Sequence, residues 1–413
     1  MAPPTVLIIG CGVSGPVLSL LLKKKGYKPV IYEKVRVLGE AGASLMLNPN
    51  GMKVLNLLTS PNKLFGDVKA LPLANLWHGT GSGETLVHNS LPSNYAARYG
   101  QSSMGIKRTT LNISLKEMAL DAGIEVHEGF ELVDIEEGEA SVTAHFGNGQ
   151  SVTGSFLVGC DGIKAASRRI LLQNSGTKEG PPIFTGLTQT AGISMTPSAL
   201  LEKPATMSNW YGNAVHLIAY PVSTTHISWA VTLSQTEERP EAWKLATRVE
   251  LEAKKQDLEA RLKGFEPALL EMVRTAERII SFGLFDRAEL SGDEWFSSRC
   301  VLIGDAAHPT SPHLGQGANQ ALEDCYHLSR LLPQLNGDSD GNLAALSPIF
   351  EEFARLRQPR TSALVKGARK KGEERVVTGG PELCRARDAQ LVVALGDAEE
   401  IQRGNDQLYR EPF

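Results

Sequence analysis

The chain has 413 residues, of which 42% are hydrophobic and 21% are charged, and its formal net charge is −4 at pH 7. That length is too great for one ordinary hydrophobic core and suits two or three packed units. The composition excludes a disordered chain, and the small negative charge gives no reason to expect a nucleic-acid partner.

The N-terminal residues lack the basic and apolar regions of a secretory leader, and no apolar run approaches the ~20 residues that span a bilayer. The chain contains no CxxC pair and an odd number of cysteines, and its histidines show no metal-ligand spacing. We expect neither a disulfide framework nor a metal site. We expect a cytoplasmic protein, a monomer or homodimer, without a transmembrane segment.

The first elements along the chain predict a strand–helix–strand unit. Residues 5–10 are aliphatic and β-branched and end at glycine, as in a buried parallel strand. The sequence GCGVSG of residues 10–15 follows at once. Residues 16–25 then carry leucines, with proline at the start and lysines at the end, as in a helix. Residues 27–32 predict a second strand, which Glu33 closes.

This GxGxxG pattern, placed between a strand and a helix, is typical of a site for an adenine dinucleotide. Gly10 makes the tight turn, Gly12 lets the pyrophosphate approach the backbone, and Gly15 lets the helix pack on the strand. The helix N-terminus offers N–H donors to the phosphates, and Glu33 is placed to accept hydrogen bonds from a ribose diol. The unit alone does not separate FAD from NAD, because both contain the same adenosine diphosphate half.

Two later strands also end in a glycine and an aspartate. Residues 156–159 are apolar and lead to Asp161, and residues 300–303 are apolar and lead to Asp305. After the second of these strands, a loop with two prolines precedes a helix that we expect to run to about residue 332.

Segment 304–317 has the pattern GDAAHPxxPxxGQG without a break. On this pattern the chain resembles the class A, para-hydroxybenzoate hydroxylase-like flavoprotein monooxygenases. The resemblance implies that Asp305 binds the ribityl chain of FAD. It also implies that four backbone units lie beside the flavin pyrimidine, those of Gly315, Gln316, Gly317 and Ala318. A helix N-terminus there favours the negative charge that reduced flavin develops near N1.

Smaller matches extend the resemblance. Residues 161–168 resemble the DGxxSxxR motif, which places Asp161 near the pyrophosphate, but Ala165 stands where serine is usual and a helix-capping hydroxyl is lost. Arg108 begins an R-x-x-L pattern, and in the family the arginine of this pattern contacts FAD. The alternative interpretation is that Arg108 forms a surface salt bridge. Three more stretches match the flavin-side loop and the R-x-P-R of the C-terminal helix, namely residues 42–44, 48–51 and 357–360.

The segments between these motifs are rich in Thr, Ser, Tyr, Trp and His with frequent turn signals, which predicts antiparallel strands. In the hairpin 214–233, alternation places His216 and Tyr220 on one face. Two interpretations stay open: these are half-buried polar residues of the sheet, or they line the substrate cavity. Many fungal members of the family carry an arginine where this chain has residues 185–190, and Gln189 is only a weak substitute candidate.

These patterns predict an α/β protein: a Rossmann-type FAD-binding domain interrupted by an antiparallel β-sheet substrate domain and followed by C-terminal helices. The expected limits are 1–72, 101–180 and 283–335 for the FAD-binding domain, 73–100 and 181–282 for the substrate domain, and 336–413 for the C-terminal helical region. Residues 240–263 predict a charged surface helix with a packed face at Leu245, Val249, Leu258 and Leu262.

The resemblance implies an FAD-dependent monooxygenase. In the implied cycle NADPH or NADH reduces FAD, and O2 then forms a flavin C4a-hydroperoxide. This species hydroxylates or epoxidises a small aromatic or polycyclic substrate, as in secondary-metabolite biosynthesis. One alternative is another flavoenzyme of the same fold, an oxidase, reductase or halogenase, although the GWxWxIP element of halogenases is missing. The other is a non-catalytic scaffold, which the intact segment 304–317 disfavours.

Overall fold

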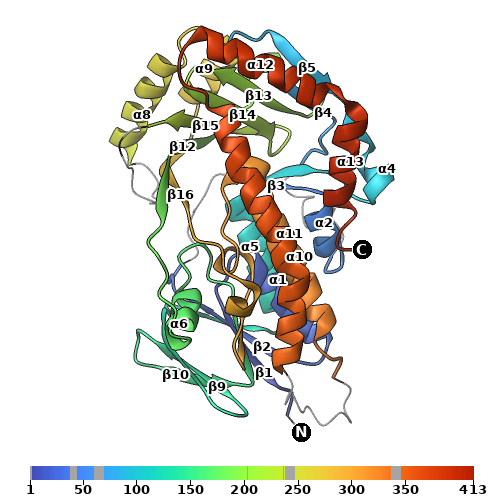
Figure 1. Ribbon diagram of the computed structural model, residues 1–413, viewed down its shortest axis with the longest axis vertical. Helices are drawn as coiled ribbons and strands as arrows, with labels where there is room; N and C mark the ends of the chain where they lie inside the picture. The colour runs from blue at the N-terminus through green and yellow to red at the C-terminus, as the bar shows by residue number, and fades with distance from the viewer. Residues whose placement is uncertain are drawn as a thin grey trace.

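The computed structural model describes residues 2–37, 44–59, 69–201, 203–235, 237, 247–335 and 346–413. A parallel sheet lies at one end of the molecule and a seven-stranded sheet at the other, and the long helix α11 (Leu346–Arg375) runs between them (Figure 1). Among the described residues, no helix combines the length and apolarity needed to cross a membrane.

The five-stranded sheet is parallel throughout and has the order β17-β11-β1-β2-β7. Its strands are β17 (Cys300–Leu302), β11 (Phe156–Gly159), β1 (Thr5–Ile9), β2 (Lys28–Glu33) and β7 (Glu125–Glu128). Val6, Leu7 and Ile8 of the central strand are completely buried. An unbroken aliphatic run is what a parallel strand needs when both of its faces are covered. The strands predicted at residues 5–10, 27–32, 156–159 and 300–303 are confirmed.

Three helices pack together on this sheet, α1 (Ser14–Lys24), α5 (Arg108–Asp121) and α10 (Gly317–Leu331), with α1 between the other two. The first helix begins at Ser14, so Gly15 lies within its first turn. A Cβ atom on Gly15 would lie 2.0 Å from the carbonyl oxygen of Gly10. Only glycine therefore allows the helix to start this close to the strand.

A small antiparallel sheet, absent from our sequence-based expectations, lies beside β1. It consists of β8 (Leu132–Glu137), β9 (Val142–Phe146) and β10 (Ser151–Gly154). Gly154 sits over Leu7 of the central parallel strand, where an added Cβ would meet the leucine side chain at 2.8 Å. Helix α6 (Ala166–Asn174) packs on β8.

The seven-stranded sheet has the order β16-β12-β15-β14-β13-β4-β5. Its strands are β16 (Arg278–Asp286), β12 (Ile183–Met195), β15 (His226–Ser234), β14 (Val215–Pro221), β13 (Thr206–Gly212), β4 (Asn75–Thr80) and β5 (Thr85–Asn89). All neighbours are antiparallel except β13 and β4, which pair in parallel. The sheet thus joins strands from both segments expected for a substrate domain, while the exact domain limits stay a prediction.

One face of this sheet packs under α8 (Arg248–Arg261) and α9 (Pro267–Arg274). Leu258 and Leu262 are buried there as expected, but Val249 is 82% exposed, so its assignment to the packed face was wrong. The helix begins after Thr247, whose side chain and that of Glu250 form a capping box. Val249 precedes the buried Leu258 by nine residues, which at about 100° per residue places it on the opposite, solvent-facing side of the helix. Leu245 lies outside the described residues.

The remaining elements connect or flank these layers. Strand β3 (Ser44–Leu47) pairs with β6 (Met104–Lys107) to form a two-stranded sheet between the two large ones. The other helices are α2 (Pro49–Asn56), α4 (Tyr95–Tyr99), α7 (Ser198–Leu201), α12 (Pro381–Gly396) and α13 (Ala398–Tyr409). The part of the chain that the structure describes also contains four single turns of 3-10 helix: η1 (Leu91–Asn94), η2 (Gly292–Trp295), η3 (Gly304–Ala306) and η4 (Pro312–Leu314).

Candidate flavin and substrate site

The three predicted glycine-aspartate and glycine-rich motifs meet at one edge of the parallel sheet. Strands β1, β11 and β17 are neighbours, so the loops at their carboxyl ends lie side by side. A Cβ on Gly10 would lie 2.5 Å from the carbonyl oxygen of Cys160, and one on Gly304 would lie 3.6 Å from Ser14 Oγ. This sheet edge is the position at which doubly wound folds bind their ligands.

The first loop leaves room and acceptors for a nucleotide. No atom of a described residue would lie within 4 Å of a Cβ built on Gly12, so these residues leave its backbone open to an approaching group. Glu33 accepts hydrogen bonds from the amide of Cys11 at 2.7 Å and from the amide of Val35 at 3.0 Å. These bonds fix the carboxylate beside the glycine loop while each oxygen keeps lone pairs for a ribose diol.

Asp305 presents a carboxylate that no described residue hydrogen-bonds. It lies in η3, and its Oδ1 would be 3.6 Å from a Cβ on Gly317. Burial raises the pKa of Asp305, an effect that the positive charges of His308 and Arg108 oppose. A partly buried acceptor without a protein donor fits the hydroxyl-bearing chain of FAD.

The segment after η4 leaves a helix N-terminus open. Gly315 adopts a left-handed conformation with φ of +61°, and α10 begins at Gly317 without a side-chain cap from Gln316. The amide oxygen of Gln316 accepts hydrogen bonds from Asn50 and Gln320 at 3.0 and 3.2 Å. The N–H groups of the first turn, which include those of Gly317 and Ala318, therefore remain for a ligand, and their partial positive charge suits an electron-rich one.

Asp161 has a role that the sequence did not indicate. Its carboxylate accepts hydrogen bonds from the amide and the hydroxyl of Ser167, at 2.9 and 2.5 Å, and so caps the first turn of α6. Burial raises the pKa of Asp161. The hydroxyl missing at Ala165 is thus replaced by a carboxylate from the preceding loop.

Arg168 connects two of the motifs. Its guanidinium donates to the carbonyl oxygens of Ala307 and Ala288 at 3.2 and 2.8 Å, and it pairs with Glu179 at 2.6 Å. The side chain is buried, and Ala307 follows Asp305 closely in the chain. The arginine of the DG motif therefore supports the loop that carries Asp305.

A second set of contacts holds the flavin-side loop against α10. The amide nitrogen of Asn319 donates to the carbonyl oxygen of Met46 at 2.9 Å, and its oxygen accepts from the amide of Asn48 at 2.9 Å. Asn50 donates to Glu323 at 2.6 Å. Of the loop matched in sequence, Gly42 and Ala43 lie outside the described residues, whereas Ser44 and residues 48–51 are placed beside α10.

The R-x-P-R stretch of α11 closes a buried ionic network with α10. Arg357 pairs with Glu323 at 2.6 Å and with Asp324 at 2.7 Å, and all three side chains are almost fully buried. Asp324 also accepts from His308 at 2.6 Å and from the amide of Gly304 at 2.8 Å. Burial alone would raise the pKa of Asp324, but His308 and Arg357 outweigh it and hold the pKa well below its ordinary value.

Tyr220 lies where the seven-stranded sheet meets the β3–β6 pair. Its hydroxyl is 2.7 Å from Ser44 Oγ, which donates to Ser228 Oγ at 2.6 Å. A Cβ on Gly105 would lie 2.7 Å from the tyrosine ring. Burial raises the pKa of Tyr220. The side of the sheet that carries Tyr220, which we call the cofactor-facing side, therefore looks towards the flavin-side loop.

His216 shares this side of β14 but is 1% exposed, and its Nε2 lies 3.0 Å from Asn209 Oδ1. Burial, followed by the charge of Arg375, places the pKa of His216 well below its ordinary value. Gln189 donates to Thr232 Oγ1 at 3.2 Å within the sheet. Both side chains thus belong to a buried polar layer of the sheet.

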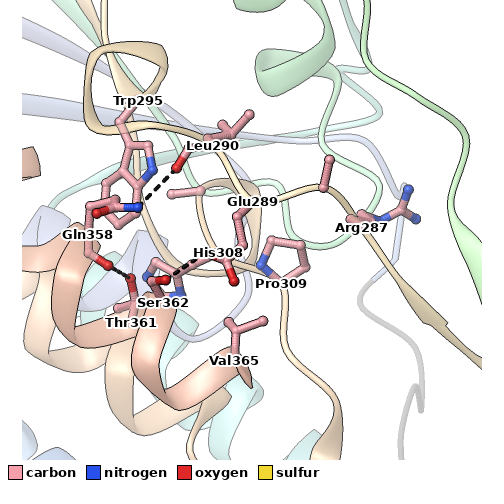
Figure 2. Close-up of a pocket in the computed structure, with 12 residues that line it drawn as sticks. Arg287, Glu289, Leu290, Trp295, His308, Pro309, Gln358, Thr361, Ser362 and Val365 are labelled. Atoms are coloured by element: carbon pink, nitrogen blue, oxygen red, sulfur yellow. Dashed lines mark hydrogen bonds between the residues drawn. The ribbon is translucent and has the colours of Figure 1, made fainter. Parts of the chain in front are cut away.

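A separate pocket opens behind the Asp305 loop, between α11 and the segment that leads to Trp295 (Figure 2). His308 and Pro309 line it, but Asp305 does not. Gln358 donates to the carbonyl oxygen of Leu290 at 3.3 Å across it. Its lining includes none of the residues that we expect to touch FAD or substrate, so we do not assign it to the reaction.

Sequence reasoning missed the supporting residues of α10. They are Asn319, Gln320, Glu323 and Asp324, and all are buried. A signal was present, because four strongly polar residues at helical spacing interrupt the stripe of an amphipathic helix. Such residues on a buried face require partners from elsewhere in the chain.

Comparisons with known proteins agree with this geometry. The profile of the family described as "FAD binding domain" matches residues 4–345. The 3-amino-4-hydroxybenzoate 2-monooxygenase PtnB3 of Streptomyces platensis is 30% identical over 394 residues, which cover 95% of this chain and 93% of that protein. The 3-hydroxybenzoate 6-hydroxylase of Klebsiella oxytoca is 27% identical over 372 residues, which cover 89% and 87%.

Among solved structures, HpxO of Klebsiella pneumoniae with FAD and uric acid has the same fold. Its TM-score is 0.81 at 23% identity, and the match covers 97% of this chain and 95% of that one. The profile match, the identity to named monooxygenases and the three converging motifs lead to one assignment. This chain belongs to the class A, para-hydroxybenzoate hydroxylase-like FAD-dependent monooxygenases.

Proposed function

We propose that the enzyme hydroxylates a small aromatic ring held between the flavin and the cofactor-facing side of the seven-stranded sheet, with NADH or NADPH as reductant and O2 as oxidant. The observation that carries this proposal is the pairing of two open features at one sheet edge. These are the unpartnered carboxylate of Asp305 and the uncapped N-terminus of α10. Named relatives are aromatic monooxygenases, which favours this reaction over that of an oxidase, reductase or halogenase.

The residues divide the holding of FAD between them. Glu33 would bind the adenosine ribose, Gly12 and its neighbours Gly10 and Gly15 the pyrophosphate, and Asp305 the ribityl chain. The backbone of residues 315–318 would face the pyrimidine ring, Asp161 would lie near the pyrophosphate, and Arg108, whose charge acts on Asp305, would contact FAD. When bound, FAD supplies the redox chemistry, accepting electrons from the nicotinamide and activating O2.

The protein's own contributions are charge, orientation and exclusion of water. The partial positive charge at the start of α10 stabilises negative charge on the neighbouring ring. Because its pKa is raised, Tyr220 stays protonated at neutral pH. Its O–H donates to Ser44 Oγ, which itself donates to Ser228 Oγ, so the tyrosine oxygen can accept a hydrogen bond from a substrate hydroxyl or amino group. Its contact with Ser44 and Ser228 provides a path along which that proton can be exchanged.

Aromatic rings with hydroxyl or amino substituents are electron-rich and suit an electrophilic oxygen donor. The benzoates named for the relatives carry such substituents. The test is NADH and NADPH oxidation by the FAD-loaded enzyme with a panel of hydroxy- and aminobenzoates, phenols and indoles, followed by mass spectrometry of products. We expect at least one aromatic compound to accelerate oxidation and to gain one oxygen atom. Acceleration without any oxygenated product across the panel would contradict the proposal.

A further inference from the structure

Five side chains from separate segments meet near the start of β14, and we call this cluster the polar wall. They are His78 on β4, Tyr211 on β13, His216 on β14, His313 on η4 and Arg375 at the end of α11. His78 Nδ1 lies 2.9 Å from the Tyr211 hydroxyl, and the rings of Tyr211 and His216 lie 5.0 Å apart. Arg375 Nη1 donates to the carbonyl oxygen of His313 at 2.8 Å, and its charge acts on Tyr211 and on all three histidines.

The polar wall lies on the cofactor-facing side of the sheet. Tyr211 and His216 are directly opposite one another across β13 and β14, and Tyr220 lies further along the same side of β14. His313 belongs to the turn that leads into Gly315, so the wall also borders the flavin end of the site. About 13 Å of strand separates His216 from Tyr220, which is room for one aromatic ring with substituents at both ends.

Arg375 is a positive charge for which the described residues offer no counter-charge. Among the described residues, its Nε and the Nε2 of His313 are buried without a hydrogen-bond partner, while its other nitrogens interact with His313 and Tyr211. Burial, followed by the charge of Arg375, lowers the pKa of His78 and of His313 to about 3. At neutral pH these two histidines are therefore neutral, as is His216, and the guanidinium is the formal charge of the wall.

The acidic residues nearest in sequence have other partners. Glu373 pairs with Arg369 at 3.2 Å and Glu374 with Lys371 at 3.4 Å. Asp388 pairs with Arg387 at 2.8 Å, the arginine whose guanidinium lies over the ring of Tyr211. A guanidinium nitrogen that is buried without an acceptor is costly until an anion reaches it, and a carboxylate matches the fork of N–H groups on an arginine.

We propose that the polar wall binds the carboxylate of an aromatic acid substrate, with Arg375 as its main ligand and the ring directed towards Tyr220. This inference rests on the proposed function and adds to it the substrate class and the residue that selects it. It also offers a reason why the chain manages without the arginine that many fungal relatives carry in the segment equivalent to residues 185–190, since a cation comes from α11 instead.

The test compares each acid with its neutral amide on the FAD-loaded enzyme. Salicylate, 3-hydroxybenzoate and 3-amino-4-hydroxybenzoate and their amides are titrated, and binding is read from the perturbation of the flavin absorbance. For the acid that binds best we expect the wild type to prefer it over its amide by about 30-fold, the effect of one charge-assisted pair. Arg375→Met should remove that preference while affecting the amide less than about 3-fold.

Arg369→Met is the matched control, because Arg369 lies on the same helix with an exposed side chain paired to Glu373 and Asp286. It should keep the wild-type preference. FAD content and thermal melting are measured for every variant. Should Arg375→Met lose FAD, Arg375→Lys keeps the charge but not the fork and should retain part of the preference.

Two results would overturn the inference: no acid in the panel binds better than its amide, or Arg375→Met keeps the wild-type preference. Failure of the proposed function looks different. The absence of any preference for acids over amides would contradict carboxylate selection and leave the proposed reaction intact, whereas absence of hydroxylation with every compound would contradict the reaction itself.

Discussion

At the scale of single residues, Asp305 shows how a buried carboxylate without a protein donor destabilises the fold. Its carboxylate is desolvated, no described residue donates to it, and its pKa is raised. An acid whose pKa is higher in the folded state than in the unfolded state carries no penalty below its unfolded pKa, where it is protonated in both states. The free energy of unfolding then falls as the pH rises from the unfolded pKa through the folded pKa. The apoprotein should therefore be less stable at neutral pH than a variant with a neutral side chain at this position.

Asp305→Asn should accordingly weaken FAD binding by about 10–100-fold, because charge-assisted hydrogen bonds to the ribityl hydroxyls are lost. The same variant without FAD should melt at a higher temperature than the wild-type apoprotein at neutral pH, and the difference should shrink in acid. Flavin fluorescence titration and calorimetry measure the two effects. An apoprotein that is destabilised at neutral pH would show that Asp305 serves the fold and not the cofactor.

Tyr220 is the residue whose role is closest to the reaction. Tyr220→Phe keeps the ring against Gly105 but removes the hydroxyl that contacts Ser44. We expect unchanged FAD affinity, a fall in kcat for hydroxylation of about 100-fold, and more NAD(P)H consumed without product. Tyr326→Phe is the control, since that ring contacts His327 and Phe413 away from β14. Equal losses in the two variants would argue against a role in proton handling.

At the scale of elements, α10 and α11 act as a pair. The start of α10 forms the flavin end of the site, and its second half is anchored to α11 by the buried network around Arg357. The pKa values of Glu323 and Asp324 are both lowered by their neighbours against the effect of burial. An acid with a lowered folded pKa contributes stability that is present above its unfolded pKa and lost as the pH falls.

Arg357→Met should therefore reduce the free energy of unfolding by about 3–5 kcal/mol at neutral pH, because two buried carboxylates lose their main partner. Part of that loss should disappear in acid, where the carboxylates become protonated. Arg355→Met, on the same helix but in an exposed pair with Glu352, should change stability by less than about 0.5 kcal/mol. Urea unfolding of both variants measures these changes. Similar losses in the free energy of unfolding for the two variants would contradict a stabilising role of the buried network.

At the scale of the whole molecule, local patterns were predictable and long-range contacts were not. The β1–α1–β2 unit and the strands that end near Asp161 and Asp305 follow from apolar runs bounded by glycine. Each lies within a short stretch of chain, where periodicity and turn chemistry are strong signals. The shared face of His216 and Tyr220 also follows from alternation alone.

Contacts between distant segments left no comparable signal. Nothing near Arg375 or His78 in sequence indicates that they meet, because their partners come from strands and helices far along the chain. The cap that Asp161 gives to α6 was missed because a carboxylate several residues before a helix is an unusual substitute for a hydroxyl at the cap. Val249 was misplaced because it precedes Leu258 by nine residues, and at about 100° per residue that spacing places the two side chains on opposite sides of the helix.

The central claim is that this enzyme places an oxygen atom from O2 into an aromatic ring, with FAD held by the three motifs. The most direct measurement is turnover of the best aromatic substrate with NAD(P)H under isotopically labelled O2, followed by mass spectrometry of the product. We expect one labelled oxygen atom in each hydroxylated product molecule, and we expect Asp305→Asn to lower the yield of that product at limiting FAD. Oxygen from water in the product, or label found only in hydrogen peroxide, would contradict it.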